Sequence, residues 1–345
     1  MTSPILIAGP CAVENEDSLS CTADSLHKLL VAQNRKLHYF RAGIWKPRSM
    51  PKAFSGVGEK GLPWLQTIQK KYETPVCVEV NSPEQIDLCE NFDIKAIWIG
   101  ARTSVNPIDV QNIADACKGR NFTVMVKNPM VADLRLWIGN IDRFLSDSTC
   151  KVMAIHRGFA DSNESVYRNR PNWEIAIDLK VHYPTLPVIC DPSHIAGQRN
   201  YIAQLSQLAI DYGFDGLMIE THYKPESALS DSNQQLTPDA YAMMLNQLHF
   251  KSSPSSPAEN ELRKQRTLIN NIDTQLSVLL QKRMSIVDAI SQIKKEHNLP
   301  VVQPEQWKKV VSLYQENSIK DDEYQEFINQ FLELLHLSSI KRQRK

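Results

Sequence analysis

Ionisable side chains stand at the end of, or just after, every short apolar run in the first part of the chain. The eight runs cover residues 5–8, 39–42, 76–80, 96–99, 123–126, 152–155, 187–190 and 216–219. The side chains are Cys11, Arg41, Glu79, Arg102 with Thr103, Lys127, Arg157, His194 and Glu220, with Lys46, Arg48, Ser49 and Asp231 further along the loops. One charged residue after a strand is common on a solvated surface. Eight of eight, divided between cations and metal-type ligands, indicate a functional site.

The cations in this set predict a site for anions. They are Arg41, Lys46, Arg48, Arg102, Lys127 and Arg157. Six positive charges brought together would repel one another strongly unless anions fill the space between them. Guanidinium groups bind phosphate and carboxylate in a bidentate manner. We therefore expect substrates that carry several phosphate or carboxylate groups.

The thiol, imidazole and carboxylates in the set suit a divalent first-row metal ion. Cys11, His194, Glu220 and Asp231 follow the first, seventh and eighth runs, which are neighbours if the strands form a closed barrel. Taken singly, such a cysteine is more often a buried hydrophobe, and such a histidine is more often a hydrogen-bonded loop residue. The four together reverse these odds and suit Mn²⁺, Fe²⁺, Co²⁺ or Zn²⁺. An electropositive mouth should also lower the pKa of the Cys11 thiol.

The elements that must position these residues alternate between strand and helix. Segments typical of helices lie between the runs, for example residues 82–91, 107–117, 172–182 and 198–212. Such alternation predicts right-handed βαβ units and a parallel sheet. Eight repeats in about 245 residues suit a (β/α)8 TIM barrel, whose functional residues lie at the carboxyl ends of the strands. An open doubly wound sheet is the alternative, but the chain has no Gly-x-Gly-x-x-Gly or Walker motif.

The remainder of the chain has a different character. All 12 glycines lie at or before Gly216, and residues 251–257 form a polar Ser/Pro stretch typical of a linker. We therefore predict an α/β barrel over residues 1–250, a linker over 251–257 and an all-α domain over 258–345. Apolar residues at intervals of three and four predict helices over 258–297, 305–315 and 321–341. The first of these would be about 60 Å long, so we expect it to pack against a second chain in a homodimer.

The composition excludes several classes of protein. Lys+Arg and Asp+Glu are both 39, so the net charge is zero, which argues against a general nucleic-acid or membrane-surface binder. No apolar run approaches the roughly 18 residues needed to span a bilayer, and the start of the chain lacks the pattern of a signal peptide. The seven cysteines have no paired spacing, so we expect free thiols and a cytoplasmic protein.

The barrel segment strongly resembles the type I 3-deoxy-D-arabino-heptulosonate 7-phosphate (DAHP) synthases. The resemblance rests on Ala8-Gly-Pro-Cys11, Lys46-Pro-Arg48-Ser49, Gly100-Ala-Arg102-Thr103, Lys127-Asn128, Arg157-Gly158, Asp191-Pro-Ser-His194, Glu220-Thr-His222 and Leu229-Ser230-Asp231. It implies condensation of phosphoenolpyruvate with erythrose 4-phosphate, the first step of the shikimate pathway. The alternative is the related 3-deoxy-D-manno-octulosonate 8-phosphate synthases, which use arabinose 5-phosphate. Those typically have Lys-Ala-Asn-Arg-Ser where this chain has Lys46-Pro-Arg48-Ser49.

The resemblance also implies a role for each residue. Cys11, His194, Glu220 and Asp231 would be the metal ligands. Arg102, Lys127 and Arg157 would hold the phosphate of phosphoenolpyruvate, and Arg41 and Lys46 would lie by its carboxylate, with Lys46 also a proton donor. Arg48, Ser49 and Thr103 would bind the aldose phosphate. Water would add near Glu79 or Lys127, and the sequence leaves open which of the two is the base.

The C-terminal segment resembles the all-helical chorismate mutases, which are dimers of three-helix chains. The resemblance rests on Leu262-Arg-x-x-Arg266, Ile272-Asp273, Leu279-x-x-x-Arg283, Lys294, Pro300 and Ser339-x-x-x-Gln343. It implies that Arg283, with Arg266 of a partner chain, holds the carboxylates of chorismate. Lys294 and Gln343 would donate to its ether oxygen, with Ser339 beside them.

Three positions depart from the mutase pattern: Gln303, Gln306 and Trp307 stand where many relatives have Asp, Arg and Glu. Weak mutase activity is therefore one expectation. A purely regulatory or dimerising helical module is the alternative. Because chorismate lies downstream of DAHP, we also expect the helical domain to mediate feedback regulation of the barrel.

Overall fold

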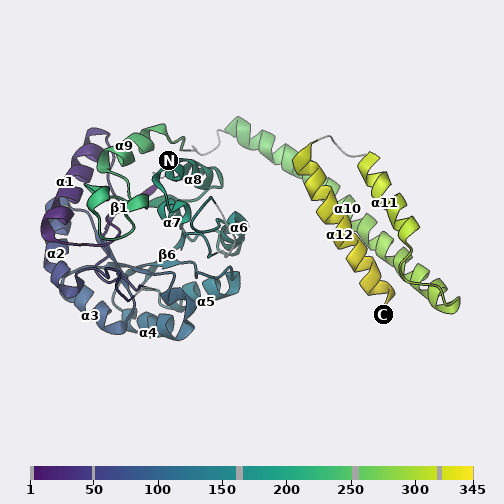
Figure 1. Ribbon diagram of the computed structural model, residues 1–345, viewed down its shortest axis with the longest axis horizontal. Coiled ribbons are helices and arrows are strands. Elements are labelled where there is room, and N and C mark those ends of the chain that lie inside the picture. Colours follow the sequence, from purple (N-terminus) through teal and green to yellow (C-terminus); the bar gives the residue numbers. More distant parts are fainter. Residues whose placement is uncertain (1–3, 49–50, 161–165, 251–255, 317–320, 345) are drawn as a thin grey trace. The chain divides into compact units, whose positions relative to one another are not determined.

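The computed structural model describes residues 4–48, 51–160, 166–250, 256–316 and 321–344, without the side chains of 256–260, 263, 264 and 267. The chain divides into two compact units, Met1–Ser252 and Ser253–Lys345. Figure 1 shows the strands and helices of each. Each unit is described by itself below.

The first unit is a closed barrel of eight parallel strands in chain order. The strands are β1 (Ile5–Gly9), β2 (Tyr39–Arg41), β3 (Val76–Val80), β4 (Ala96–Ile99), β5 (Thr123–Lys127), β6 (Lys151–His156), β7 (Val188–Cys190) and β8 (Gly216–Glu220). The barrel closes where β1 pairs with β8 from Ile5↔Gly216 to Gly9↔Glu220. The predicted TIM barrel is therefore confirmed, and the open doubly wound sheet is excluded.

Helices surround this barrel, as Figure 1 shows. They are α1 (Glu16–Ala32), α2 (Leu62–Tyr72), α3 (Pro83–Asn91), α4 (Pro107–Cys117), α5 (Leu134–Leu145), α6 (Trp173–His182), α7 (Pro192–Ala196), α8 (Ile202–Asp211) and α9 (Pro238–Gln247). The described loops also contain short 3₁₀ helices, which are η1 (Gly58–Gly61), η2 (Thr103–Val105), η3 (Arg199–Tyr201), η4 (Pro225–Ser227) and η5 (Ser232–Gln234).

Several helix starts follow from local sequence. Proline is the first residue of α3, α4, α7 and α9, where its missing N–H costs nothing and its fixed φ suits the helix. The side chains of Asn106, Asp191 and Thr237 accept hydrogen bonds from backbone N–H groups in the first turn of α4, α7 and α9. The cap on α7 has a further consequence, because Asp191 also belongs to the site described below.

Two apolar clusters hold the barrel together. The larger lies between the strands and the surrounding helices, and it includes the fully buried Trp137, Phe122 and Leu65. The smaller fills the barrel itself with Ile7, Cys77, Ala96, Trp98, Met125, Met153, Ile155, Ile189 and Met218. The barrel interior is therefore packed with side chains and is not a channel, as is usual for this fold.

The second unit is all-helical. It consists of α10 (Ser256–Glu296), α11 (Pro304–Glu316) and α12 (Asp322–Gln343). The three predicted helices are present. The first begins at Ser256, inside the stretch predicted as linker, and residues 251–255 of that stretch lie outside the described part of the chain. Bidentate contacts of 2.5 and 2.7 Å between Arg342 and Asp288 join α12 to α10.

Within the described residues, no helix is both long and apolar enough to cross a membrane.

Candidate active site

The charged residues at the barrel mouth continue the period-two pattern of the barrel interior. Successive residues of a strand face opposite sides, so residues two apart share a face. Thus Met125 of the interior cluster is followed by Lys127. Likewise, Cys77 precedes Glu79, Ile155 precedes Arg157, Ile189 precedes Asp191 and Met218 precedes Glu220. Each of these five strands therefore places an apolar side chain in the barrel and an ionisable one above it, on the strand or directly after it.

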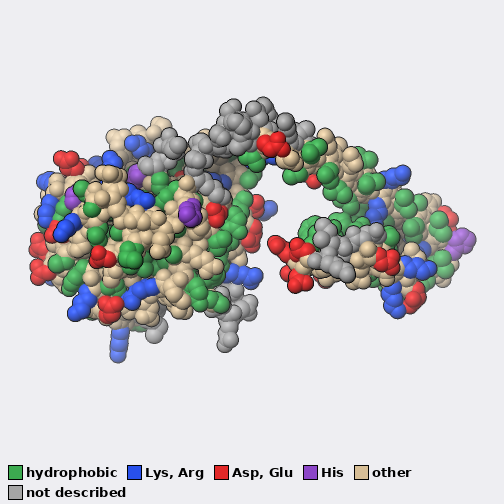
Figure 2. Space-filling model, turned by 90° about the horizontal axis from the view of Figure 1, so that it is seen from above, with side chains coloured by type: hydrophobic (Ala, Val, Ile, Leu, Met, Phe, Trp, Pro, Cys, Tyr) green, Lys and Arg blue, Asp and Glu red, His purple; other side chains and the backbone are tan. Residues whose placement is uncertain are grey.

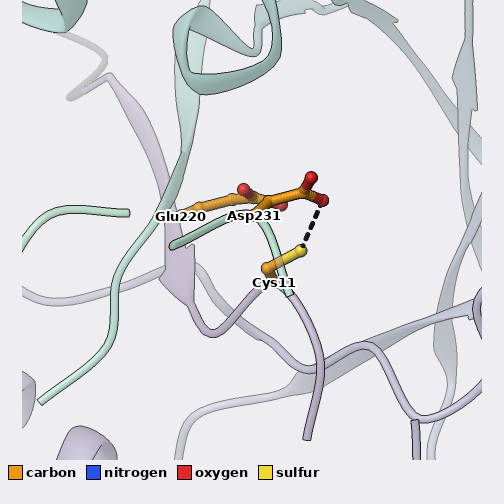
Figure 3. A group of neighbouring side chains, drawn as sticks. All are labelled: Cys11, Glu220 and Asp231. Carbon is orange, nitrogen blue, oxygen red and sulfur yellow. Dashed lines mark hydrogen bonds between the residues drawn. The ribbon is translucent and has the colours of Figure 1, made fainter. Parts of the chain in front are cut away.

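A group of metal-type ligands lies where the first and eighth strands end. The Cys11 sulfur and one carboxylate oxygen each of Glu220 and Asp231 lie within 4.8 Å of one another (Figure 3). Cys11 Sγ lies 3.1 Å from Asp231 Oδ2. Gln235 accepts a hydrogen bond from the Cys11 backbone N–H at 3.0 Å, which fixes the cysteine. Thiol and carboxylate donors this close together, and this deeply buried, fit a divalent first-row ion.

The fourth predicted ligand, His194, lies beside this group but is not one of the three. Its Nε2 is 3.6 Å from Glu220 Oε1, and its Nδ1 is 2.8 Å from Asp191 Oδ2. Burial lowers the pKa of His194 to about 4. The imidazole is therefore neutral near pH 7, with a ring nitrogen that can act as a metal ligand. The contact with Asp191 orients the ring, as an outer carboxylate commonly does at a metal site.

Asp191 was not assigned a role from the sequence, although its motif was noted. Its carboxylate has no exposed surface and contacts three positive or protonatable groups. Lys127 Nζ donates to Oδ2 at 2.7 Å, and Arg41 Nη1 lies 4.0 Å from the same oxygen. The other oxygen, Oδ1, accepts the backbone N–H of His194 at 3.1 Å. Asp191 thus connects the cations of the site to its metal-type ligands.

Lys46 and Arg48 extend from the loop after β2 to Asp231. Lys46 Nζ contacts Cys11 Sγ closely and donates to Asp231 Oδ2 at 2.9 Å. Arg48 Nη2 donates to Ser230 Oγ at 2.9 Å, and its Nη1 lies 3.5 Å from Asp231 Oδ2. Ser49, predicted to bind an anion with Arg48, lies outside the described residues.

Arg168 is a further cation that sequence reasoning missed. From the loop between β6 and α6, its Nη1 donates to Asp231 Oδ1 at 3.0 Å and to Gln234 Oε1 at 2.8 Å. Gln234 in turn donates to Glu220 Oε2 at 2.7 Å. Arg168 does not follow directly on a strand among the described residues, since β6 ends at His156, so position relative to the strands could not have identified it.

The remaining cations surround the aromatic floor of the site. Trp98 fills the barrel below them, with the Arg41 guanidinium 5.1 Å and the Lys127 ammonium 5.8 Å from its ring centroid. Arg41 donates to Glu220 Oε1 at 3.0 Å. Both cations are therefore held in fixed positions by a carboxylate and an aromatic face, at distances typical of cation–π contacts.

Arg157 lies among other positive charges. Its Nη1 donates to Asn169 Oδ1 at 2.7 Å, and Asn169 donates to the His194 carbonyl at 2.6 Å. Burial lowers the pKa of Arg157 to about 10; the Asp191 charge opposes this shift, and the charges of Arg168 and Arg102 act in the same direction as burial. Cations that perturb one another in this way favour a bound anion. Thr103 is buried in η2, directly after Arg102.

Glu79 is held close to the end of β4. A side chain at Gly100 would run into the Glu79 carboxylate, so glycine at this position lets Glu79 keep the place it has here. The charge of Glu79 also acts on Lys127, whose pKa is lowered chiefly by burial. The two candidates for the base therefore lie near each other.

The prediction that the pKa of the Cys11 thiol is lowered is wrong. Burial raises the pKa of Cys11 above its ordinary value, and the Glu220 and Asp231 charges raise it further, although Lys46 and Arg41 oppose them. Neither the burial of Cys11 nor its closeness to these two carboxylates can be read from the sequence. The pKa of Lys46 is raised instead, because Cys11, Glu220 and Asp231 outweigh the effect of its burial.

The helical unit has a pocket of about 210 Å³ that brings together four of its five predicted site residues. Arg283 donates to Ser339 Oγ at 2.8 Å, and Lys294 donates to Gln343 Oε1 at 3.1 Å. Lys294 also donates to the Val301 carbonyl at 2.7 Å. Arg266 is exposed on α10 and is not among the residues lining the pocket.

The three departures from the mutase pattern line this same pocket. Gln303, Gln306 and Trp307 belong to its wall. Trp307 stacks on His336 of α12 with ring centroids 4.0 Å apart and an angle of 24° between the ring planes. Among the described residues that line the pocket, Arg283 and Lys294 are the permanent charges and no carboxylate opposes them. The pocket therefore suits an anion.

Comparison with known families and proteins agrees with both units. Residues 2–252 match the DAHP synthetase I family, and residues 265–344 match chorismate mutase type II. A phospho-2-dehydro-3-deoxyheptonate aldolase of Thermotoga maritima is 31% identical over 232 residues. That alignment covers 67% of this chain and 64% of the relative, so the chain spans less than two thirds of its length. A 2-dehydro-3-deoxyphosphooctonate aldolase of Wolinella succinogenes is 25% identical, covering 71% of this chain and 97% of that protein.

Two solved DAHP synthase structures are similar to part of this chain. The crystal structure of the Thermotoga maritima DAHP synthase superposes with a TM-score of 0.62 at 28% identity, covering 70% of this chain and 67% of that one. A truncated form of the 3-deoxy-D-arabino-heptulosonate 7-phosphate synthase from the same organism gives a TM-score of 0.59 at 26% identity, covering 70% and 84%.

Proposed function

This chain belongs to the DAHP synthetase I family, and from this premise we propose that its barrel condenses phosphoenolpyruvate with erythrose 4-phosphate. The observation that carries the proposal is the Cys11, Glu220 and Asp231 group, which lies against Lys46 in a mouth lined with cations. The chemistry requires such an arrangement, because it must hold two multiply charged anions together and activate an aldehyde between them.

The metal centre is part of the proposal. Cys11, Glu220 and Asp231, with His194 beside them, would hold a divalent ion, Mn²⁺ first, with Fe²⁺, Co²⁺ or Zn²⁺ as alternatives. When bound, the ion would polarise the aldehyde oxygen of the sugar as a Lewis acid.

The side chains around this centre divide the remaining work. Arg102, Lys127 and Arg157 would hold the phosphate of phosphoenolpyruvate, and Arg41 would lie by its carboxylate. Arg48, Ser49 and Thr103 would bind the phosphate of the aldose. This fixed orientation is worth several kcal/mol relative to free reactants.

The reaction would proceed with Lys46 as proton donor. The methylene carbon of phosphoenolpyruvate bonds to the aldehyde carbon, and the aldehyde oxygen takes a proton from Lys46. Water then adds to the carbon bearing the phosphate, losing its proton near Glu79 or Lys127. Cleavage of the bond between that carbon and the phosphate oxygen releases inorganic phosphate and leaves DAHP.

The related octulosonate reaction is the alternative for the barrel. The Wolinella succinogenes relative covers as much of this chain as the Thermotoga maritima protein does, but at lower identity. The segment Lys46-Pro-Arg48, without an inserted Asn, supports the shorter sugar.

The test follows the ultraviolet absorbance of phosphoenolpyruvate with erythrose 4-phosphate or arabinose 5-phosphate, each with EDTA or with added Mn²⁺. Mn²⁺-dependent loss with erythrose 4-phosphate alone supports the proposal, and loss only with arabinose 5-phosphate overturns it.

A second activity, rearrangement of chorismate to prephenate, is supported by the helical pocket. A pericyclic step needs no nucleophile, only fixed donors aimed at the oxygen on which negative charge develops. Lys294 and Gln343 would supply them, while Arg283 and Ser339 would hold a carboxylate. Disappearance of chorismate absorbance with the full chain tests this activity. No loss of chorismate would leave the helical unit as a dimerising or regulatory module.

The mutase site as proposed needs a second copy of the chain. A row of large apolar side chains on α10 is exposed in the single chain, including Leu268 56%, Ile269 56%, Ile272 56%, Leu276 50% and Leu279 60%. Figure 2 shows hydrophobic side chains at the surface of this unit. Pairing of two such helices would cover the row and would bring Arg266 of the partner to the pocket.

Feedback is the remaining part of the proposal. We propose that a ligand bound to the helical unit changes the binding of substrates to the barrel. Because such coupling is reciprocal, the barrel substrates would then change the affinity of the helical unit for that ligand. The test compares the rate of condensation with and without prephenate or chorismate. If neither compound changes the rate, this feedback proposal is wrong.

A further inference from the structure

A cavity of about 220 Å³ lies between α1 and α2, at the end of the barrel where the strands begin. Leu37 and Thr74 line it just before β2 and β3, whereas the proposed active site lies where those strands end. The lining residues are Ala23, His27, Leu30, Val31, Arg35, Lys36, Leu37, Phe40, Ile68, Tyr72, Glu73 and Thr74. The cavity is therefore separate from the proposed condensation chemistry, and the proposed function assigns it no role.

Two buried hydrogen-bond donors belong to residues that line this cavity. Arg35 Nη1 and the Tyr72 hydroxyl are both buried, and neither has a hydrogen-bond partner among the described residues. A buried donor left unpaired costs about 1–3 kcal/mol, so such groups are rare in folded proteins. Each of the two groups therefore lacks an acceptor that a bound ligand could supply.

Aromatic and aliphatic side chains make up much of the remaining lining. The rings of His27 and Tyr72 lie with centroids 4.6 Å apart and form one wall. Leu30, Phe40 and Ile68 are buried and supply aliphatic and aromatic surface. Aromatic walls of this kind favour a planar apolar group.

The Arg35 side chain is already held in position. Its guanidinium carbon lies 5.8 Å from the centroid of the Phe250 ring, at cation–π distance. Among the described residues of the lining, Arg35 and Lys36 are the cations and Glu73 is the one carboxylate, so positive charge is in excess. A guanidinium held on one face keeps its donors available for an anion at little entropic cost.

We propose that this cavity binds a small carboxylate with a planar apolar body. The carboxylate would accept from Arg35 Nη1 and the Tyr72 hydroxyl, and the apolar body would lie against His27, Leu30 and Phe40. The space corresponds to roughly seven waters at about 30 Å³ each, which limits the ligand to about the size of a single ring with a short acidic arm.

The test is calorimetric titration of the full chain with phenylacetate and with its neutral isostere, phenylacetamide. Saturating phosphoenolpyruvate is present throughout, so that the cationic barrel mouth does not capture the probe. We expect phenylacetate to bind at least tenfold more tightly than the amide. Arg35→Gln should weaken phenylacetate binding at least tenfold. Arg135→Gln, the same change at an exposed position of α5, should leave the affinity unchanged.

Two further variants separate occupation of the cavity from other effects. Val31 is 55% exposed on α1, so Val31→Trp should obstruct the cavity without removing a polar group or disturbing the core. It should abolish binding, whereas Lys294→Gln in the helical pocket should not change it. Equal binding of acid and amide, no binding of phenylacetate, or full affinity in Arg35→Gln would each overturn the proposal and leave the cavity as solvent-filled space. Because condensation is not the readout, failure of the proposed function would not affect this result.

Discussion

Asp191, directly after β7, accepts a hydrogen bond from Lys127 of β5 at 2.7 Å, although β6 lies between these two strands. The same carboxylate oxygen lies 2.8 Å from Nδ1 of His194. One buried carboxylate therefore positions both a proposed phosphate-binding cation and a proposed metal ligand. Removing one member of a buried ion pair leaves an uncompensated charge, which is strongly destabilising.

Asp191→Asn should therefore affect both halves of the site. We expect a loss of about 3 kcal/mol in the free energy of unfolding. We also expect Mn²⁺ affinity to fall and condensation to drop at least a hundredfold, because Lys127 and His194 both lose their orienting partner. Urea unfolding, calorimetry with Mn²⁺ and the condensation assay measure these effects. Asp24→Asn, which removes the exposed partner of Lys71, is the control and should cost at most about 1 kcal/mol. Normal metal affinity in Asp191→Asn would contradict the orienting role.

His156 should make the barrel sensitive to acid. It is fully buried among Trp137, Phe159, Trp173 and Phe214, and burial lowers its pKa from 6.5 to about 3. The unfolded chain thus takes up a proton first as the pH falls. The contribution of neutral His156 to the free energy of unfolding is fully present above pH 6.5. It is lost progressively as the pH falls toward 3.

The comparison is between the wild type and His156→Gln, by urea unfolding of the barrel at pH 8 and pH 5. The wild type should lose about 2 kcal/mol more than the variant between these two values. His182→Gln, at an exposed position of α6, should follow the wild type. Equal pH dependence in wild type and His156→Gln would mean that another group dominates.

Metal loading should depend on Glu220. Added Mn²⁺ should raise the melting temperature of the wild type, because a ligand that binds only the folded state stabilises it. Glu220→Gln should abolish that rise as well as condensation. Glu226→Gln, at an exposed residue of η4, should retain both. Full condensation after exhaustive chelation, with no metal found by elemental assay, would show that the reaction does not require a metal.

Lys294 and its neighbour provide a matched pair for the mutase activity. Lys294 is buried in the pocket and donates to Gln343, whereas Lys295 is exposed. Lys294→Gln should reduce kcat for chorismate at least a hundredfold, the usual effect of losing one donor to a developing oxyanion. Lys295→Gln should have no effect. If the two variants behave alike, the pocket is not the site of rearrangement.

A charge in the exposed apolar row of α10 should separate the proposed dimer. Ile272→Glu should convert it to a monomer in analytical ultracentrifugation and should also abolish mutase activity, since Arg266 of the partner would be lost. Val181→Glu places the same charge on an apolar residue of α6 that is 73% exposed, and it should alter neither property. A monomeric wild type would exclude the dimer at once.

The barrel could be predicted because its signals are local. Short apolar runs separated by helical segments specify strands and helices without reference to distant residues, and all eight strands lie at or within two residues of their predicted positions. The period of two along a strand then places Lys127 above Met125 and Glu220 above Met218. Side-chain type and strand position were therefore enough to select most of the candidate site.

The sequence by itself thus determined the two architectures and the residue types available for chemistry. Only the tertiary structure decided which groups meet. Asp191 pairs with Lys127 and His194, and Arg168 reaches Asp231, through contacts between segments far apart in the chain. The burial of Cys11 in the folded barrel also raises the pKa of its thiol. The physical reason is that hydrogen-bond distance and loss of solvent depend on the packing of the whole barrel, whereas strand and helix periodicity depends on neighbours in the sequence.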